Sequence, residues 1–149
     1  MKKTVQIVAL LMLVLMLIAI RVFVQPYFYD PLIDYFKSDY LSKPIPQINF
    51  KLFFLNLLYR YSLNSTISLA IIYLVFKNIK TLMFSLKIYI IAFVVLCMIL
   101  LLLLKYNLNL DYQLIFYVRR FLIHPIFLLI LLPAFYYQQL KTRKVRFKK

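Results

Sequence analysis

Residues 82–104 read LMFSLKIYIIAFVVLCMILLLLL and carry one charge, Lys87. A helix needs about 20 consecutive apolar residues to cross the hydrocarbon core of a bilayer. Three further apolar runs of sufficient length cover residues 5–24, 52–76 and 114–137. The bilayer core holds no water for backbone amides, so such runs form helices or a closed barrel, and these lack a barrel strand's alternation. The sequence therefore predicts an all-α bundle of four transmembrane helices, the fourth of them kinked at Pro125 and Pro133.

The composition supports one membrane domain over residues 1–149. Hydrophobic residues make up 65% of the chain, whereas a soluble domain carries apolar surface on one face of each element. The first run resembles a signal peptide, but its apolar core is too long and residues 21–24, Arg-Val-Phe-Val, offer no small-residue cleavage site. We therefore expect it to remain as a transmembrane helix.

Composition also excludes several function classes. The formal net charge of +15 raises nucleic acid as a partner. The basic residues, however, flank and interrupt apolar runs, so we expect membrane lipids and no nucleic acid. Cys97 is the single cysteine, which excludes an internal disulfide and a cysteine zinc cluster. One histidine without clustered acids predicts no metal site, and the lack of glycine excludes a phosphate loop, so no cofactor is expected.

The lysines and arginines predict an orientation. Eleven basic residues and no acid lie in three segments: the N-terminus, the connection after the second run and the tail 138–149. They are Lys2, Lys3, Lys77, Lys80, Lys87, Lys141, Arg143, Lys144, Arg146, Lys148 and Lys149. The opposite side, mainly the loop 25–51, mixes signs: Lys37, Lys43, Lys51 and Lys105 with Asp30, Asp34, Asp39 and Asp111. The positive-inside rule then predicts a multi-pass membrane protein with both termini in the cytoplasm.

Four arginines lie inside the apolar runs: Arg21, Arg60, Arg119 and Arg120. The predicted direction of each helix places all of them, together with His124, in the outer half of the bilayer. An arginine at mid-membrane costs at least ~2.5 kcal/mol on insertion scales, so the arginines need an explanation. Snorkelling to lipid phosphates explains Arg21 better than it explains Arg60 or Arg120.

Two of the arginines belong to periodic polar patterns. Asn56, Arg60, Asn64 and Ser68 recur every four residues, which predicts one polar stripe on a helix. Arg120 and His124 share the same spacing, with Tyr117 one turn before them. Such a pattern favours contact with a partner helix or a water-filled cleft, and it is either glue between helices or a functional site.

The external loop completes the predicted site. Asp30-Pro31 is typical of an N-cap followed by a first helical proline, and Leu32, Phe36 and Tyr40 then fall on one face. We expect a short interfacial helix that ends before Pro44 and covers the arginines. The excess of arginine over acid favours an anion. The candidate binding or interaction residues are Arg21, Asp30, Asn56, Arg60, Asn64, Tyr117, Arg119, Arg120 and His124.

Three sequence segments resemble the exosortase F system-associated membrane proteins of Bacteroidota: residues 28–32 with Tyr35-Phe36, Arg60-Tyr61 with Asn64, Ser68 and Phe76, and residues 116–123 with Pro125 and 133–138. The resemblance covers nearly the whole chain. It implies an accessory role beside a membrane transpeptidase-like enzyme that processes sorting signals at the outer face of the inner membrane. It supplies no catalytic residues.

Three functions remain open at this stage. The leading hypothesis is a non-enzymatic accessory protein that docks to an exosortase-like enzyme or presents its substrate at the outer leaflet. A membrane enzyme acting on lipid or peptide through Arg120, His124 and Cys97 is the first alternative, although Cys97 lies in an apolar stretch that favours a structural cysteine. A small anion- or lipid-binding transporter subunit is the second.

Overall fold

The computed structural model describes residues 3–24, 27–37, 47–105 and 112–146. Every regular element in these ranges is helical: α1 (Lys3–Ala19), the π-helical turn η1 (Ile20–Val24), α2 (Leu32–Lys37), α3 (Phe50–Phe76), α4 (Ile79–Lys105), α5 (Tyr112–Ile123) and α6 (Ile126–Arg146). The predicted all-α class is confirmed. The predicted short external helix corresponds to α2, whereas Tyr40, Lys43, Pro44, Asp39 and Asp111 lie outside the described residues.

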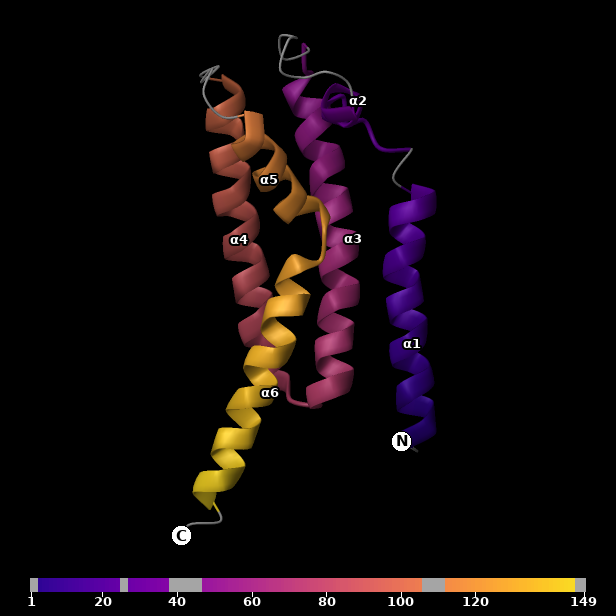
Figure 1. The fold of residues 1–149 in the computed structure, drawn as a ribbon, viewed down its shortest axis with the longest axis vertical. Coiled ribbons are helices and arrows are strands. Elements are labelled where there is room, and N and C mark those ends of the chain that lie inside the picture. Colours follow the sequence, from indigo (N-terminus) through magenta and orange to yellow (C-terminus); the bar gives the residue numbers. More distant parts are fainter. Residues whose placement is uncertain (1–2, 25–26, 38–46, 106–111, 147–149) are drawn as a thin grey trace.

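The long helices lie side by side and alternate in direction (Figure 1). The start of α1, the turn between α3 and α4, and the end of α6 lie at one end of the molecule. The short helix α2 and the starts of α3 and α5 lie at the other end. Helix α3 packs against α1, α4, α5 and α6, so it is the central element of the bundle.

Two of the described helical segments are long and apolar enough to cross a membrane, Lys3–Phe23 and Ile79–Lys105. A third candidate is a bent pair, Gln113–Ile123 with Ile126–Lys141, whose two halves meet at 63°. Helix α3 has the same 27-residue length as α4 but is not among the candidates. Asn56, Arg60 and Asn64 lower its hydropathy. The chain therefore has two to three helices apolar enough to span a membrane.

The segment 114–137, expected as one transmembrane helix kinked at its prolines, is a pair of helices joined by a break. The chain is helical up to Ile123, breaks at His124 and Pro125, and resumes at Ile126. Pro125 has no backbone N–H, and its ring obstructs the preceding turn. The Ile126 N–H instead bonds to the His124 carbonyl at 2.8 Å. Pro133, which was expected to disturb the same segment, lies inside α6 without ending it.

Side-chain and backbone caps define the ends of α3. The Asn49 side chain accepts a hydrogen bond from the Leu52 N–H at 3.3 Å, which satisfies one free amide of the first turn. At the other end Lys77 adopts a left-handed conformation (φ 49°, ψ 34°) and its N–H bonds to the Tyr73 carbonyl. Left-handed residues commonly end helices, and here one reverses the chain directly into α4.

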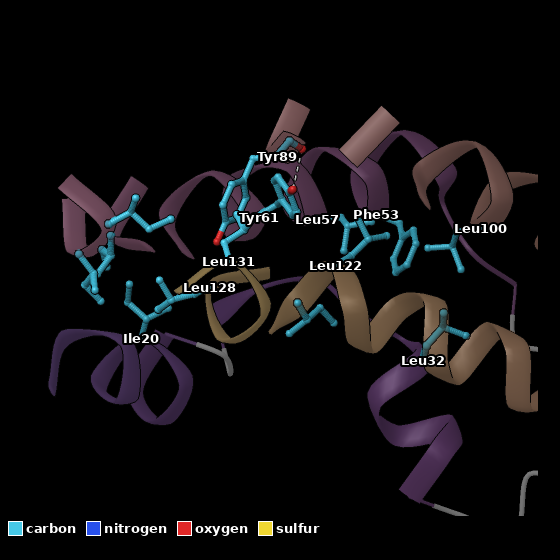
Figure 2. Close-up of a cluster of buried hydrophobic side chains, with 14 of the residues drawn as sticks. Ile20, Leu32, Phe53, Leu57, Tyr61, Tyr89, Leu100, Leu122, Leu128 and Leu131 are labelled. Carbon is cyan, nitrogen blue, oxygen red and sulfur yellow. Dashed lines mark hydrogen bonds between the residues drawn. The ribbon is translucent and has the colours of Figure 1, made fainter. Parts of the chain in front are cut away.

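The core is a continuous layer along α3 (Figure 2). Phe53 and Leu57 lie near the α2 end of the bundle, and Leu122 of α5 lies beside them (Figure 2). Tyr61 connects this layer to α4, because its hydroxyl donates to the Tyr89 carbonyl at 2.7 Å. The layer also holds Leu32 of α2, which is completely buried.

Helix α1 is the least enclosed part of the bundle. None of its residues is fully buried, and Leu10, Leu13 and Leu17 pack only partly against the core. The Gln6 amide fastens the helix by donating to the Leu74 carbonyl of α3 at 2.7 Å. The remaining surface of α1 is exposed and apolar over most of its length. A patch of this extent is typical of a surface that meets lipid or another protein.

Candidate functional site

Asp30 is the centre of the candidate site. The Arg119 Nε donates to both Asp30 carboxylate oxygens at 3.1 Å, and Arg119 Nη2 donates to Oδ2 at 2.5 Å. The two residues are separated by 89 positions in the sequence. Asp30 and Arg119 side chains are only 5% and 10% exposed. A bidentate guanidinium–carboxylate pair of this kind fixes both the distance and the relative orientation of the two side chains. It therefore joins the segment before α2 to α5.

Arg60 brings α3 into the same pair. Its Nη1 lies 3.4 Å from Asp30 Oδ2, and its guanidinium carbon lies 5.9 Å from the centre of the Phe28 ring. Arg60 is buried, with 5% of its surface exposed. A buried cation without partners is costly, whereas here a carboxylate and an aromatic face both stabilise the charge. We call Asp30, Arg60 and Arg119 the Asp30 cluster.

The Asp30 side chain therefore differs from its expected role as a helix cap. Helix α2 begins one residue later than predicted, at Leu32, and the Asp30 carbonyl accepts the Ile33 N–H at 3.1 Å. The carboxylate turns instead toward the two arginines. Two positive charges in a buried setting attract a carboxylate more strongly than the amides of a six-residue helix. The short helix then packs by Leu32 and through the contact of Phe36 with Phe116.

Asn64 supports the break between α5 and α6. Its amide nitrogen donates to the Ile123 carbonyl at 2.9 Å and to the Arg60 carbonyl of its own helix at 3.2 Å. Where a helix ends inside a bundle, its last carbonyls lack intrahelical donors. Asn64, on the neighbouring helix α3, supplies such a donor for the Ile123 carbonyl. Ser68, one turn further along α3, bonds back to the Asn64 carbonyl at 2.7 Å, so this part of the polar stripe is satisfied internally.

Two adjoining cavities lie beside the break. One, of about 150 Å³, is lined by Arg21, Arg60, Asn64, His124 and Pro125 together with apolar residues of α1 and η1. The other, of about 200 Å³, is lined by Arg21, Arg60, Phe116, Arg119, Arg120, Ile123 and His124. Arg21, Arg60 and His124 border both. We call this joint space the cationic cavity.

The electrostatics of the cavity are unbalanced. Among the described residues, the ion pairs found for Arg21, Arg60, Arg119 and Arg120 all go to Asp30. Arg21 and Arg120 have no carboxylate partner there and are exposed on one side. A larger cavity of about 750 Å³ is bordered by Arg21, Asp30, Asp34 and Lys37, among others. Arg21 lies at the junction of this larger space and the cationic cavity.

The structure brings most of the predicted site residues together, but not all. Arg21, Arg60, Asn64, Arg119, Arg120 and His124 border the cationic cavity, and Asp30 neutralises two of them. Asn56 bonds to the Leu52 carbonyl of its own helix at 2.8 Å and lines a small pocket beside Asp30 and Arg60, outside the cationic cavity. Tyr117 is 53% exposed and borders none of these cavities. Its spacing from Arg120 is three residues, which leaves an angular offset on the helix.

Cys97 is not among the residues that line the cavities containing His124. It is partly buried on α4 and packs against the core. Arg120 and His124 do share a cavity, so two of the three residues of the enzyme alternative lie together. The described residues contain no group of three or more potential metal ligands.

Two aromatic residues of the site entered the sequence analysis only within the segments of the resemblance, not as candidate site residues. Phe28 packs on Arg60, and Phe116 lies 5.9 Å from the Arg120 guanidinium carbon while bordering the cationic cavity. Phe116 also contacts Phe36 of α2 with 5.3 Å between ring centres. In an aromatic-rich chain these residues have no distinctive spacing. The one available signal is that Phe116 stands four residues before Arg120, on the same helical face.

The chain matches no protein-family model, and neither a curated protein nor a solved structure shows significant similarity to it. The resemblance to the exosortase F system-associated proteins therefore stays a prediction, and the function is argued from the site.

Proposed function

We propose that this chain is a four-helix inner-membrane protein that serves as a non-enzymatic accessory subunit of an exosortase F-type sorting system. In this role it docks to the sorting enzyme or presents the enzyme's substrate at the outer leaflet. One observation carries the proposal. The three segments on which the resemblance rests contribute Asp30, Arg60 and Arg119, and these residues form one buried cluster.

The Asp30 cluster holds those three segments together. Asp30 holds the external segment against α3 and α5, and α2 follows directly as a short covered helix. A fixed external surface suits a protein that docks to a partner, because less conformational entropy is lost on binding. The exposed apolar surface of α1 offers a second area for a membrane partner.

The proposal includes α3 as a transmembrane helix despite its low hydropathy. Its polar residues Arg60, Asn64 and Ser68 are buried in the bundle. Its outward face exposes apolar and aromatic side chains, among them Leu55, Leu58, Tyr59 and Leu63. The hydroxyl of the exposed residue Thr66 donates a hydrogen bond to the Ser62 carbonyl of the same helix at 2.7 Å. Polar groups that face the interior or bond to their own helix are compatible with a lipid surface.

Labelling of single cysteines in a Cys97→Ser background tests this topology. Asp34→Cys and Lys51→Cys should react with a membrane-impermeant maleimide in intact spheroplasts. Asn78→Cys should react only after permeabilisation, because it follows α3. Labelling of Lys51→Cys and Asn78→Cys from the same side would contradict α3 as a transmembrane helix.

Co-purification tests the accessory role. An affinity-tagged chain, expressed with an exosortase F-type enzyme in the same cells, should retain that enzyme after mild detergent extraction. An unrelated tagged multi-pass protein serves as the control. Sorting of a substrate should decrease when the chain is deleted and should recover with Cys97→Ala. Absence of co-purification together with normal sorting in the deletion strain would contradict the proposal.

The cationic cavity also favours the transporter alternative, because it could bind an anion inside the bundle. The two functions predict different behaviour in isolation. A transporter subunit that works alone should support anion uptake into vesicles that contain only this protein, whereas an accessory subunit should not.

A further inference from the structure

The four intramembrane arginines divide into two pairs. Arg60 and Arg119 share the Asp30 carboxylate and are buried. Arg21 and Arg120 have no carboxylate within the described residues and are exposed. Among the described residues, Asp30 supplies the one carboxylate paired with these four arginines, so this part of the site keeps an excess of positive charge. Such an excess next to a cavity favours an anionic ligand.

Polar side chains reach the cavity from several directions. Arg21 belongs to the π-helical turn at the end of α1, Arg120 belongs to α5, and His124 stands at the break before α6. π-Helical turns occur often at functional sites. Helix α6 also begins at this break, and in broken membrane helices the positive start of the second half favours an anion. The cavity therefore combines converging side chains with a favourable backbone end.

We propose that the cationic cavity binds a phosphate group carried by a membrane lipid. Guanidinium groups bind phosphate and carboxylate through paired hydrogen bonds. A carboxylate presents two oxygens in one plane, as Asp30 does for Arg60 and Arg119. Phosphate oxygens are arranged tetrahedrally, so they can accept from Arg21, Arg120 and an imidazole N–H of His124 that arrive from different sides.

The surroundings of Arg21 and Arg120 indicate a lipid as the carrier. Val22 and Phe23 follow Arg21 in the sequence, and Phe121 follows Arg120; all three are exposed apolar side chains. Phosphate bound between the arginines would leave the attached acyl chains against this apolar surface, which adds binding energy that free phosphate lacks. This inference goes beyond the accessory role and does not depend on the identity of a protein partner.

Native mass spectrometry of the purified chain in a phosphate-free detergent tests the proposal. The ligands are phosphatidylglycerol, diacylglycerol with the same acyl chains, and inorganic phosphate. Wild type should retain one phosphatidylglycerol and bind the other two far more weakly. Arg21→Gln and Arg120→Gln should each weaken phosphatidylglycerol binding by about tenfold, as expected for the loss of one charged hydrogen-bonding partner. Lys51→Gln, an exposed cation at the start of α3, is the matched control and should leave binding unchanged.

Each other outcome overturns the assignment. Equal binding of diacylglycerol would mean that the tails alone are recognised, and equal binding of inorganic phosphate would make the source soluble. An equal loss with Lys51→Gln would mean general attraction of lipid to positive charge. Unchanged binding in both arginine variants would place the ligand elsewhere. The variants lie on different helices, so a folding defect in one leaves the other informative, and the chain is tested without a sorting enzyme.

Discussion

The Asp30 cluster and the cationic cavity use the same residue type for opposite purposes. In the cluster, Arg60 and Arg119 are buried and share a carboxylate. At the cavity, Arg21 and Arg120 are exposed and have no acid partner among the described residues. The difference indicates that an arginine in an apolar helix stabilises the fold when its charge is neutralised within the fold. An arginine whose charge is not neutralised within the fold is available to bind a ligand.

The largest effect should come from removing the shared carboxylate. Asp30→Asn leaves two buried guanidinium groups without a counter-charge, which typically costs about 3–5 kcal/mol. We expect a large loss of thermal stability in detergent and lower protein levels in membranes. Asp34→Asn, which changes an exposed acid of α2, is the control and should change stability by less than about 0.5 kcal/mol. Equal effects of the two substitutions would contradict the role of the cluster.

The next largest effect concerns the helix break. Asn64→Leu keeps a similar volume but removes the donor to the Ile123 carbonyl, so an acceptor is left buried and unpaired. The expected cost is about 1–3 kcal/mol in the free energy of unfolding. Asn56→Leu is the matched control, because the Asn56 amide bonds only within its own helix. It should cost less, as measured by thermal unfolding of both variants side by side.

A smaller effect is expected where α3 meets α4. Tyr61→Phe removes the hydroxyl that donates to the Tyr89 carbonyl, at an expected cost of about 1 kcal/mol. Tyr59→Phe, on the exposed face of α3, should be close to neutral. A destabilisation by Tyr59→Phe that equals the effect of Tyr61→Phe would argue against the α3–α4 contact.

The smallest effects on stability should come from the cavity arginines. Arg21→Gln and Arg120→Gln remove charges that have no carboxylate partner in the described part of the chain, so the free energy of unfolding without lipid should change by less than about 0.5 kcal/mol. Thermal unfolding in a lipid-free detergent measures this. A loss comparable to that of Asp30→Asn would erase the distinction between the two pairs.

Much of this organisation could be predicted from the sequence, because depth in a bilayer follows from the order and direction of apolar runs. That argument put Asp30 and the four arginines at one level, and Asp30 does contact Arg60 and Arg119. Rotation about a helix axis is harder to infer. The sequence therefore grouped Tyr117 with the site although its side chain is exposed and outside the cavities.

Other features depend on tertiary contacts that no local pattern records. Pro125 signalled a disturbance, but the 63° break also needs Asn64 to satisfy the freed carbonyl from another helix. The cap predicted at Asp30 followed a sound local rule, yet the charges of distant arginines attract that carboxylate more strongly. The polar stripe of α3 also depends on tertiary contacts. It lowers the hydropathy of the helix, and it becomes buried only once the neighbouring helices pack around it.

The most direct test compares the lipid-induced rise in melting temperature for wild type, Arg120→Gln and Asp30→Asn. With phosphatidylglycerol added to detergent-solubilised protein, the account predicts that Arg120→Gln has the wild-type melting temperature without lipid and loses most of the lipid-induced rise. Asp30→Asn should melt at a lower temperature without lipid. A full lipid-induced rise in Arg120→Gln would contradict the division of the arginines into a structural pair and a ligand-binding pair.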